Sequence, residues 1–150
     1  MHQPPGNVFQ SAYIVKDLKA SMKRWYETNG AGPFYFMENV TMGPDIFSYR
    51  GTPSTTNFGV ALGNMGQFQL ELIQPYDDLP SAYRDSYKSG EEGFHHFGIV
   101  AHDYEAALAH YAARGYAVSQ SGISNGMRFC YFDARHEFQC MLEVIEDAPT

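Results

Sequence analysis

Apolar and polar positions follow one another along the chain in an order that occurs twice. The apolar run 10–15 precedes Asp17 and a stretch with apolar residues three and four positions apart, and the same order returns 86 residues later around Asp103. The runs predict strands, and the spacing predicts an amphipathic helix after each run. Each Asp is suited to cap its helix by accepting hydrogen bonds from first-turn amides. The chain is therefore expected to hold two copies of one structural unit.

The remainder of each copy predicts three further strands. The first helix is expected to end at Asn29-Gly30 and the second near Gly115, because glycine adopts the left-handed conformation that closes helices. Each copy finishes with an apolar run that contains one carboxylate. The runs expected to form these strands are 33–40, 58–62 and 68–73 in the first copy, and 116–120, 128–132 and 141–145 in the second.

The predicted fold class is thus α+β, with two tandem β-α-β-β-β modules in one domain spanning residues 1–150. Module one covers residues 8–75, and module two covers residues 94–146. Residues 76–93 are polar and contain Pro80, which is typical of a connection. A short helix near residues 81–87 is expected within this linker.

Two polar residues interrupt the apolar strands of each module. Gln10 lies seven residues before Asp17, and His96 lies seven before Asp103, so the duplication places them equivalently. Glu71 and Glu143 occupy the final strands of the two modules. Two buried carboxylates close together are costly unless a cation neutralises them.

A divalent metal ion is the natural partner of such a set. Gln10, Glu71, His96 and Glu143 offer an amide oxygen, two carboxylates and an imidazole, a donor set suited to Zn, Ni, Co, Mn or Fe. The alternative is that the Gln and His are hydrogen-bonded core residues while both Glu side chains face solvent. Their duplicated positions favour the metal. His95 would point to the opposite strand face by strict alternation, so it is left out of the predicted site.

The sequence resembles the vicinal oxygen chelate superfamily, which includes glyoxalase I, methylmalonyl-CoA epimerase, extradiol dioxygenases and bleomycin-resistance proteins. The resemblance covers nearly the whole chain and depends on the order and spacing of short motifs. These are Gln10-Ser-Ala-Tyr-Ile-Val-Lys-Asp-Leu, Gly32-Pro33-Phe34, Leu70-Glu71-Leu72-Ile73, Gly93-Phe94-His95-His96-Phe97-Gly98-Ile99-Val100 and Leu142-Glu143-Val144-Ile145-Glu146.

The resemblance implies an incomplete barrel around a divalent metal, with Gln10, Glu71, His96 and Glu143 at the ligand positions. A bound metal can hold two adjacent substrate oxygens and stabilise the enolate that forms when the neighbouring proton leaves. The resemblance points to Glu143 as a carboxylate that takes this proton. Glu38 is a second candidate, with a surface charge as its alternative.

Several superfamily reactions fit the sequence poorly. An extradiol dioxygenase requires two His and one carboxylate as iron ligands, which this set lacks. The positions expected to grip glutathione carboxylates hold Ile14 and Pro75, and neither side chain can pair with an anion. No evident site serves the phosphates of a CoA ester. The inward strand face is expected to supply an apolar cavity wall formed by Ala12, Ile14, Ile73, Gly98, Val100 and Met141.

These observations favour a small metal-dependent isomerase or lyase that acts through a metal-stabilised enolate on a substrate with vicinal oxygens and an apolar or aromatic body. A non-catalytic module that binds or sequesters small molecules is the alternative, and it would need no metal. A third possibility is a function unlike that of any characterised member, because fold does not determine function.

Composition and charge narrow the partners further. The 150 residues carry a formal net charge of −7 without a basic cluster, which argues against nucleic acid or anionic lipid. No apolar run is long enough for a membrane helix. The N-terminal residues lack the features of a secretory signal, so a cytoplasmic location is expected. Open sheet edges favour pairing with a second copy, which predicts a homodimer.

Overall fold

The computed structural model of the protein describes residues 4–41 and 47–148, and both expected modules are present in it. Module one contains β1 (Asn7–Ile14), α1 (Leu18–Asn29), β2 (Tyr35–Thr41), β3 (Phe47–Tyr49), β4 (Thr52–Pro53), β5 (Asn57–Met65) and β6 (Phe68–Pro75). The linker carries α2 (Ala82–Ser86). Module two contains β7 (Gly93–Ala101), α3 (Tyr104–Ala112), β8 (Ala117–Ser124), β9 (Met127–Asp133), α4 (Arg135–Phe138) and β10 (Met141–Glu146).

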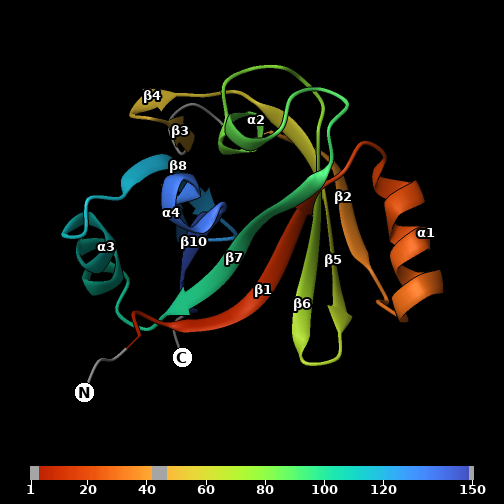
Figure 1. Ribbon diagram of the computed structural model, residues 1–150, viewed down its shortest axis with the longest axis horizontal. Coiled ribbons are helices and arrows are strands. Elements are labelled where there is room, and N and C mark those ends of the chain that lie inside the picture. The colour runs from red at the N-terminus through yellow and green to blue at the C-terminus, as the bar shows by residue number, and fades with distance from the viewer. Residues whose placement is uncertain (1–3, 42–46, 149–150) are drawn as a thin grey trace.

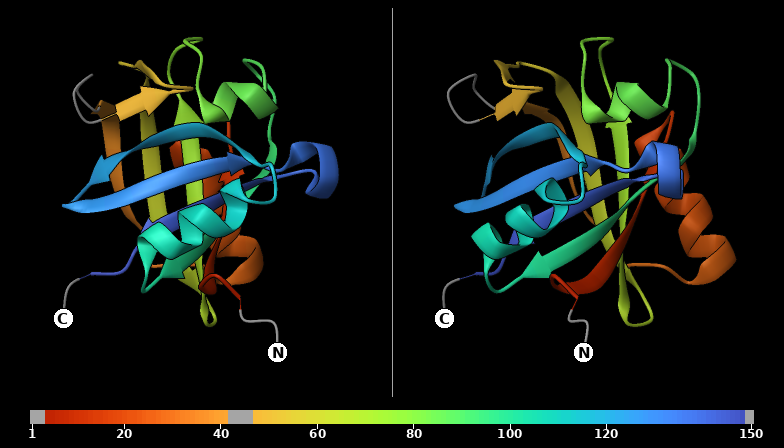
Figure 2. Two further views of the ribbon diagram at one scale, coloured as in Figure 1. Left: turned by 90° about the vertical axis from the view of Figure 1, so that its left-hand side faces the viewer. Right: turned by 60° about the vertical axis from the view of Figure 1, so that its left-hand side comes forward.

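The strands form one mixed sheet in the order β2-β5-β6-β1-β7-β10-β9-β8-β3-β4. β1 and β7 join the modules by antiparallel pairing, and each also pairs in parallel with the last strand of its own module. The sheet curls into a half-barrel, with α1 and α3 on its outer side (Figures 1 and 2). The predicted α+β class is confirmed. The four strands with the candidate ligands, β6, β1, β7 and β10, are adjacent at the centre of the sheet.

Both long helices begin at the predicted aspartates. Asp17 accepts a hydrogen bond from the amide of Ala20, and Asp103 accepts one from the amide of Ala106. α1 ends at Gly30, whose φ of 68° is a left-handed conformation that glycine adopts without strain. Each helix buries one stripe against the outer face of its own module, as Leu18 and Tyr104 illustrate.

The inner face of the sheet carries a separate apolar cluster. Its buried members come from both modules and from α2, so the two halves of the half-barrel share one core. They are Ala12, Ile14, Phe47, Phe58, Val60, Ile73, Ala82, Tyr83, Phe129, Tyr131 and Met141. Side chains alternate between the two faces, since Ala61 packs under α1 whereas its neighbour Val60 faces inward.

Three short elements were not predicted from the sequence. The β3–β4 hairpin belongs to module one, but β3 pairs with β8 of module two and extends that sheet. It stays there because Phe47 is 2% exposed and packs against the ring of Phe129. α4 is a single short helix between β9 and β10. Segments this short carry no periodic signal that sequence analysis can use.

Within residues 4–41 and 47–148, none of the helices has the length and apolar character needed to cross a bilayer. The cytoplasmic location stays a prediction.

Candidate metal centre

The curvature of the sheet brings the four predicted ligands together on its inner face. Gln10 comes from β1, Glu71 from β6, His96 from β7 and Glu143 from β10. Single ligand atoms of Glu71, His96 and Glu143 all lie within 4.8 Å of one another. Residues from four strands and two modules therefore meet at one point.

His96 stands at the centre of this group. Its Nε2 atom lies 3.1 Å from Oε1 of Gln10, 3.4 Å from Oε1 of Glu71 and 3.3 Å from Oε1 of Glu143. The imidazole is fully buried, and the two carboxylate side chains are only 14% and 9% exposed. One nitrogen thus faces three oxygen atoms in a site that excludes most water.

The charges of the group are strongly coupled. Burial acts to lower the pKa of His96, but its ion-pair contacts with the carboxylates of Glu143 and Glu71 outweigh burial and raise the pKa to about 9. Burial is also the main cause that raises the pKa of Glu71, and the nearby charge of Glu143 adds to it. Two carboxylates and one imidazolium leave a surplus negative charge when no further cation is bound.

A second observation also indicates that these four side chains suit a divalent ion. Oε1 of Glu71 is buried and has no hydrogen-bond partner. A buried carboxylate oxygen without a hydrogen-bond partner is costly. This one lies beside the imidazole of His96, which also faces the side-chain oxygens of Gln10 and Glu143. Three oxygens and one nitrogen at this spacing can surround Zn²⁺ or a similar hard-to-borderline ion.

Gln10 is held in place by its neighbours on both adjacent strands. Its Nε2 donates a hydrogen bond of 2.7 Å to Oε1 of Gln69, which leaves its own Oε1 facing His96. On the other side it pairs with Gly98. A Cβ atom at position 98 would lie 2.6 Å from Oε1 and 2.8 Å from Cβ of Gln10. Position 98 of β7 therefore requires glycine, because a larger residue would displace the side chain of Gln10.

His95 corrects the expectation from strict strand alternation. A β-bulge lies where Ala12 pairs with His96 and Tyr13 pairs with Phe94, so His95 is the extra residue. The bulge turns both histidines inward. His95 is fully buried, and its Nδ1 lies 2.7 Å from Nδ1 of His96. Sequence spacing alone gives no signal for a bulge within an otherwise regular strand.

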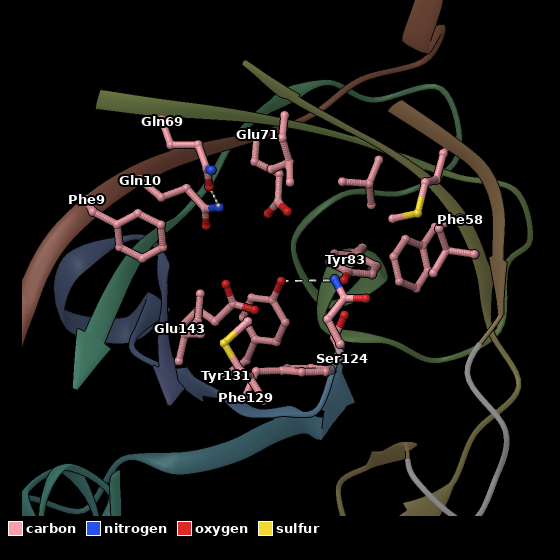
Figure 3. A pocket seen from close by; sticks show the side chains of 17 residues that line it. Phe9, Gln10, Phe58, Gln69, Glu71, Tyr83, Ser124, Phe129, Tyr131 and Glu143 are labelled. Carbon is pink, nitrogen blue, oxygen red and sulfur yellow. Dashed lines mark hydrogen bonds between the residues drawn. The ribbon is translucent and has the colours of Figure 1, made fainter. Parts of the chain in front are cut away.

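A cavity of about 300 Å³ opens from the carboxylates. Figure 3 shows Gln10, Glu71 and Glu143 directed into it, with aromatic rings on the surrounding wall. Neither Lys nor Arg occurs among the described residues of this lining. The apolar part of the wall consists of Phe9, Met37, Val40, Phe58, Val60, Leu62, Met127, Phe129 and Ile145.

The predicted wall residues were wrong in detail, although the apolar character holds. None of Ala12, Ile14, Ile73, Gly98, Val100 and Met141 lines the cavity. Ala12, Ile14, Ile73 and Met141 face inward as expected but lie within the buried core. Because the sheet curls, these inward-facing side chains of the central strands pack into the core. The apolar wall of the cavity comes mainly from strands farther out, such as β2 and β5.

Three other positions lie away from the cavity. Glu38 on β2 is 49% exposed and forms a 3.5 Å ion pair with Lys19 of α1. The structure therefore does not bring Glu38 to the other candidate residues, and a β-bulge between Met37 and Val40 interrupts the pairing of its strand. Ile14 and Pro75 are also absent from the lining, so they give no information on what the cavity binds.

Two tyrosine residues in the cavity were missed by sequence analysis. Tyr83 of α2 and Tyr131 of β9 line the wall, and their hydroxyl oxygens lie 3.5 Å apart. Burial raises the pKa of both residues, so both hydroxyl groups are neutral donors at physiological pH. The linker helix thus contributes to the site, which a division of the chain into two modules did not indicate.

Comparison with known proteins agrees with the fold. Residues 9–131 match the Glyoxalase/Bleomycin resistance protein/Dioxygenase superfamily. The chain belongs to the vicinal oxygen chelate superfamily. A search of curated proteins by sequence found no match.

Solved structures with the same fold include several epimerases. Methylmalonyl-CoA epimerase from Mycobacterium tuberculosis gives a TM-score of 0.69 at 14% identity, over 99% of this chain and 93% of the other. A Streptomyces coelicolor methylmalonyl-CoA epimerase variant in complex with 2-nitronate-propionyl-CoA gives 0.68 at 18% identity, over 97% and 100%. A hypothetical protein from Bacillus halodurans gives 0.68 at 14% identity, over 98% of both chains. At these identities the similarity establishes the shared fold.

Proposed function

We propose that the protein is a divalent-metal-dependent isomerase or lyase that moves a proton next to a carbonyl group. The substrate would carry two adjacent oxygens and an apolar or aromatic body. One observation carries this proposal: two carboxylates, an imidazole and an amide oxygen converge at the inner end of an apolar cavity, and one carboxylate oxygen lacks a hydrogen-bond partner.

Gln10, Glu71, His96 and Glu143 would hold the ion. When bound, a divalent ion polarises a carbonyl oxygen and offsets the negative charge that develops when the adjacent proton leaves. The two carboxylates balance its charge, so the centre is formally neutral. A neutral centre favours neutral chelating substrates over dianions, because the cavity offers no cationic side chain in its described lining.

Glu143 would accept the proton. Its carboxylate lines the cavity, so a substrate carbon in that space lies within its reach. The hydroxyl groups of Tyr83 and Tyr131, on the wall of the same cavity, are neutral donors that can orient a second substrate oxygen. The apolar wall excludes water from the reacting carbon.

The size of the cavity supports a compact substrate. About 300 Å³ is the lower end of the range for small-molecule pockets and accommodates an acyl group or a small aromatic compound. The similar Streptomyces coelicolor enzyme binds an acyl-CoA ligand. For this chain an acyl-CoA would place only its acyl part inside, and its phosphates would meet an acidic protein of net charge −7.

Solvent exchange tests the proposal. The zinc-loaded protein would be incubated in deuterium oxide with benzoin, which has vicinal oxygens, aromatic rings and one carbon-bound proton next to its carbonyl group. NMR would follow loss of that proton, and parallel samples would contain propionyl-CoA or the glutathione hemithioacetal of methylglyoxal. We expect exchange with benzoin and slow turnover of the hemithioacetal.

Two Glu-to-Gln variants separate the roles. Glu143→Gln is expected to lower the exchange rate by about 10²–10⁴-fold, the usual contribution of a positioned base. Glu38→Gln is the matched control, and its rate should equal that of the wild type because Glu38 pairs with Lys19 at the surface. Efficient glutathione-dependent turnover would overturn the proposed substrate class.

A non-catalytic binding protein of the same fold remains the second candidate, and the apolar wall of the cavity favours it. Such a protein would bind benzoin equally well after chelator treatment. Exchange that is absent with all the chelating carbonyl compounds, together with metal-independent binding, would replace the enzyme proposal with this one.

A further inference from the structure

His95 takes no part in the chemistry proposed above, yet it is fully buried directly behind His96. The cavity does not reach it. Its ring makes two polar contacts in the structure: Nδ1 lies 2.7 Å from Nδ1 of His96, and Nε2 lies 2.8 Å from the carbonyl oxygen of Ala82. These two contacts determine where the protons of both rings can lie.

The contact with Ala82 fixes one end of this chain of hydrogen bonds. A backbone carbonyl oxygen can only accept, so Nε2 of His95 must carry a hydrogen and donate it. Ala82 is held in place, since it is fully buried at the start of α2 and its own amide donates a 2.8 Å hydrogen bond to Oε1 of Gln120. A neutral imidazole carries one ring hydrogen, which leaves Nδ1 of His95 as an acceptor.

The other end of the chain is then determined. Because Nδ1 of His95 accepts, Nδ1 of His96 must donate. A neutral His96 with its hydrogen on Nδ1 has its lone pair on Nε2. That atom faces Oε1 of Gln10 and the carboxylates of Glu71 and Glu143, where the metal would bind.

The opposite arrangement would require His95 to be an imidazolium. The described groups that face its ring are the aromatic rings of Tyr83, Tyr131 and His96, together with the Ala82 carbonyl. No carboxylate contacts it in the described part of the chain. A fully buried cation without an anionic partner is disfavoured by several kcal/mol.

We propose that His95 is a positioning residue that fixes the tautomer of His96 and aims its Nε2 lone pair at the metal. The proposal rests on the metal centre of the proposed function. Without an acceptor at this place, His96 could carry its hydrogen on Nε2 and point an N–H group at the ion. Outer hydrogen-bond partners of this kind contribute about 10–100-fold to metal affinity.

Three substitutions distinguish this role from simple core packing. In His95→Asn, the amide oxygen can occupy the place of Nδ1 and still accept from His96, although it no longer reaches Ala82. In His95→Gln, the amide reaches the place of Nε2 and the Ala82 carbonyl but leaves no acceptor at Nδ1. His95→Leu retains neither hydrogen bond.

Zinc affinity, measured by competition with a chromophoric chelator, is the main readout. We expect His95→Asn to bind zinc nearly as tightly as the wild type, and His95→Gln and His95→Leu to bind about 10–100-fold more weakly. Thermal unfolding of each metal-free variant reports packing damage separately. Equal affinities of the Gln and Asn variants would overturn the proposed role while leaving the metal centre intact.

The ring protons can also be observed directly. Nitrogen NMR of the metal-free wild type should show a bare Nδ1 and a protonated Nε2 on His95. A protonated Nδ1 on His95 would overturn the proposal whatever the zinc affinities. A wild-type protein that binds no zinc would instead refute the metal centre of the proposed function, and the role of His95 with it.

Discussion

Replacing Glu71 by Gln should make the metal-free protein more stable and abolish its stabilisation by zinc. In the metal-free protein, the imidazolium of His96 needs one anionic partner, and Glu143 supplies it at 3.3 Å. Glu71 is the surplus carboxylate, since its Oε1 is buried without a hydrogen-bond partner and burial raises its pKa. A neutral amide of nearly the same shape removes that charge.

The structure sets the expected magnitude. A buried charge that is not fully paired costs several kcal/mol, and the lost attraction between Glu71 and His96 offsets most of what its removal gains. We therefore expect a net gain of about 1 kcal/mol, which raises Tm by about 2–4 °C for a domain of this size. In the wild type, zinc at about 1,000 times its Kd should add about 4 kcal/mol, and this increment should vanish in Glu71→Gln.

Thermal unfolding with and without zinc tests both parts. Glu38→Gln is the matched control: it also replaces a carboxylate by an amide, but at an exposed position paired with Lys19, so neither Tm nor the zinc increment should change. We assign Glu71 as a metal ligand whose negative charge is not balanced in the metal-free protein. A Glu71→Gln protein that is less stable than the wild type without metal, or that keeps the full stabilisation by zinc, would refute this assignment.

Three further predictions concern other parts of the structure. Gly98→Ala should displace Gln10, destabilise the protein by about 1–3 kcal/mol and weaken zinc binding; unchanged zinc affinity would contradict the contact of position 98 with Gln10. Hydrogen bonds from Arg135, with Arg50 assisting, hold the pKa of Asp133 well below its usual range, so this carboxylate stabilises the fold above about pH 4 and loses that effect as the pH falls further. Solvent screens the cluster, so the effect should be about 1 kcal/mol, and an Asp133→Asn variant should show the same difference from wild type between pH 5 and 7 and a shrinking one below pH 4. The exposed apolar residues Tyr35, Phe36 and Met37 on the edge strand β2 support a homodimer, and sedimentation that gives only a 16.9 kDa species would contradict it.

Much of the fold could be predicted because the duplication makes each weak signal appear twice. Asp17 and Asp103 cap their helices as expected, and both final strands lie beside the first strand of their own module. The helix stripes are less accurate: the spacing of apolar residues also predicts Tyr26 on the buried face of α1, and its side chain is 65% exposed. An aromatic residue at the margin of a stripe can lie on either side of it, and packing rather than spacing decides.

The parts that sequence analysis missed all depend on contacts between distant segments. The inward turn of His95 arises from a bulge in its pairing with β1, and the β3–β4 hairpin lies where Phe47 meets Phe129 of the other module. Tyr83 reaches the cavity from a linker helix whose sequence carries no sign of that position. The meeting of Gln10, Glu71, His96 and Glu143 was predictable because their equivalent places in the repeat were visible; their role as ligands stays a proposal.

The structure separates the candidate reactive groups from the surface that would select a substrate. All four candidate ligands lie on β6, β1, β7 and β10, the central strands, where neighbours on both sides restrict any change. The apolar wall comes mainly from the outer strands β2 and β5 and from β9 with the turn that precedes it, as Met37, Leu62 and Met127 illustrate. A substitution in this wall changes the shape of the cavity without touching a ligand. If the cavity takes a substrate, we expect residues mostly outside the duplicated motifs to select it, so the motifs identify the superfamily and leave the substrate open.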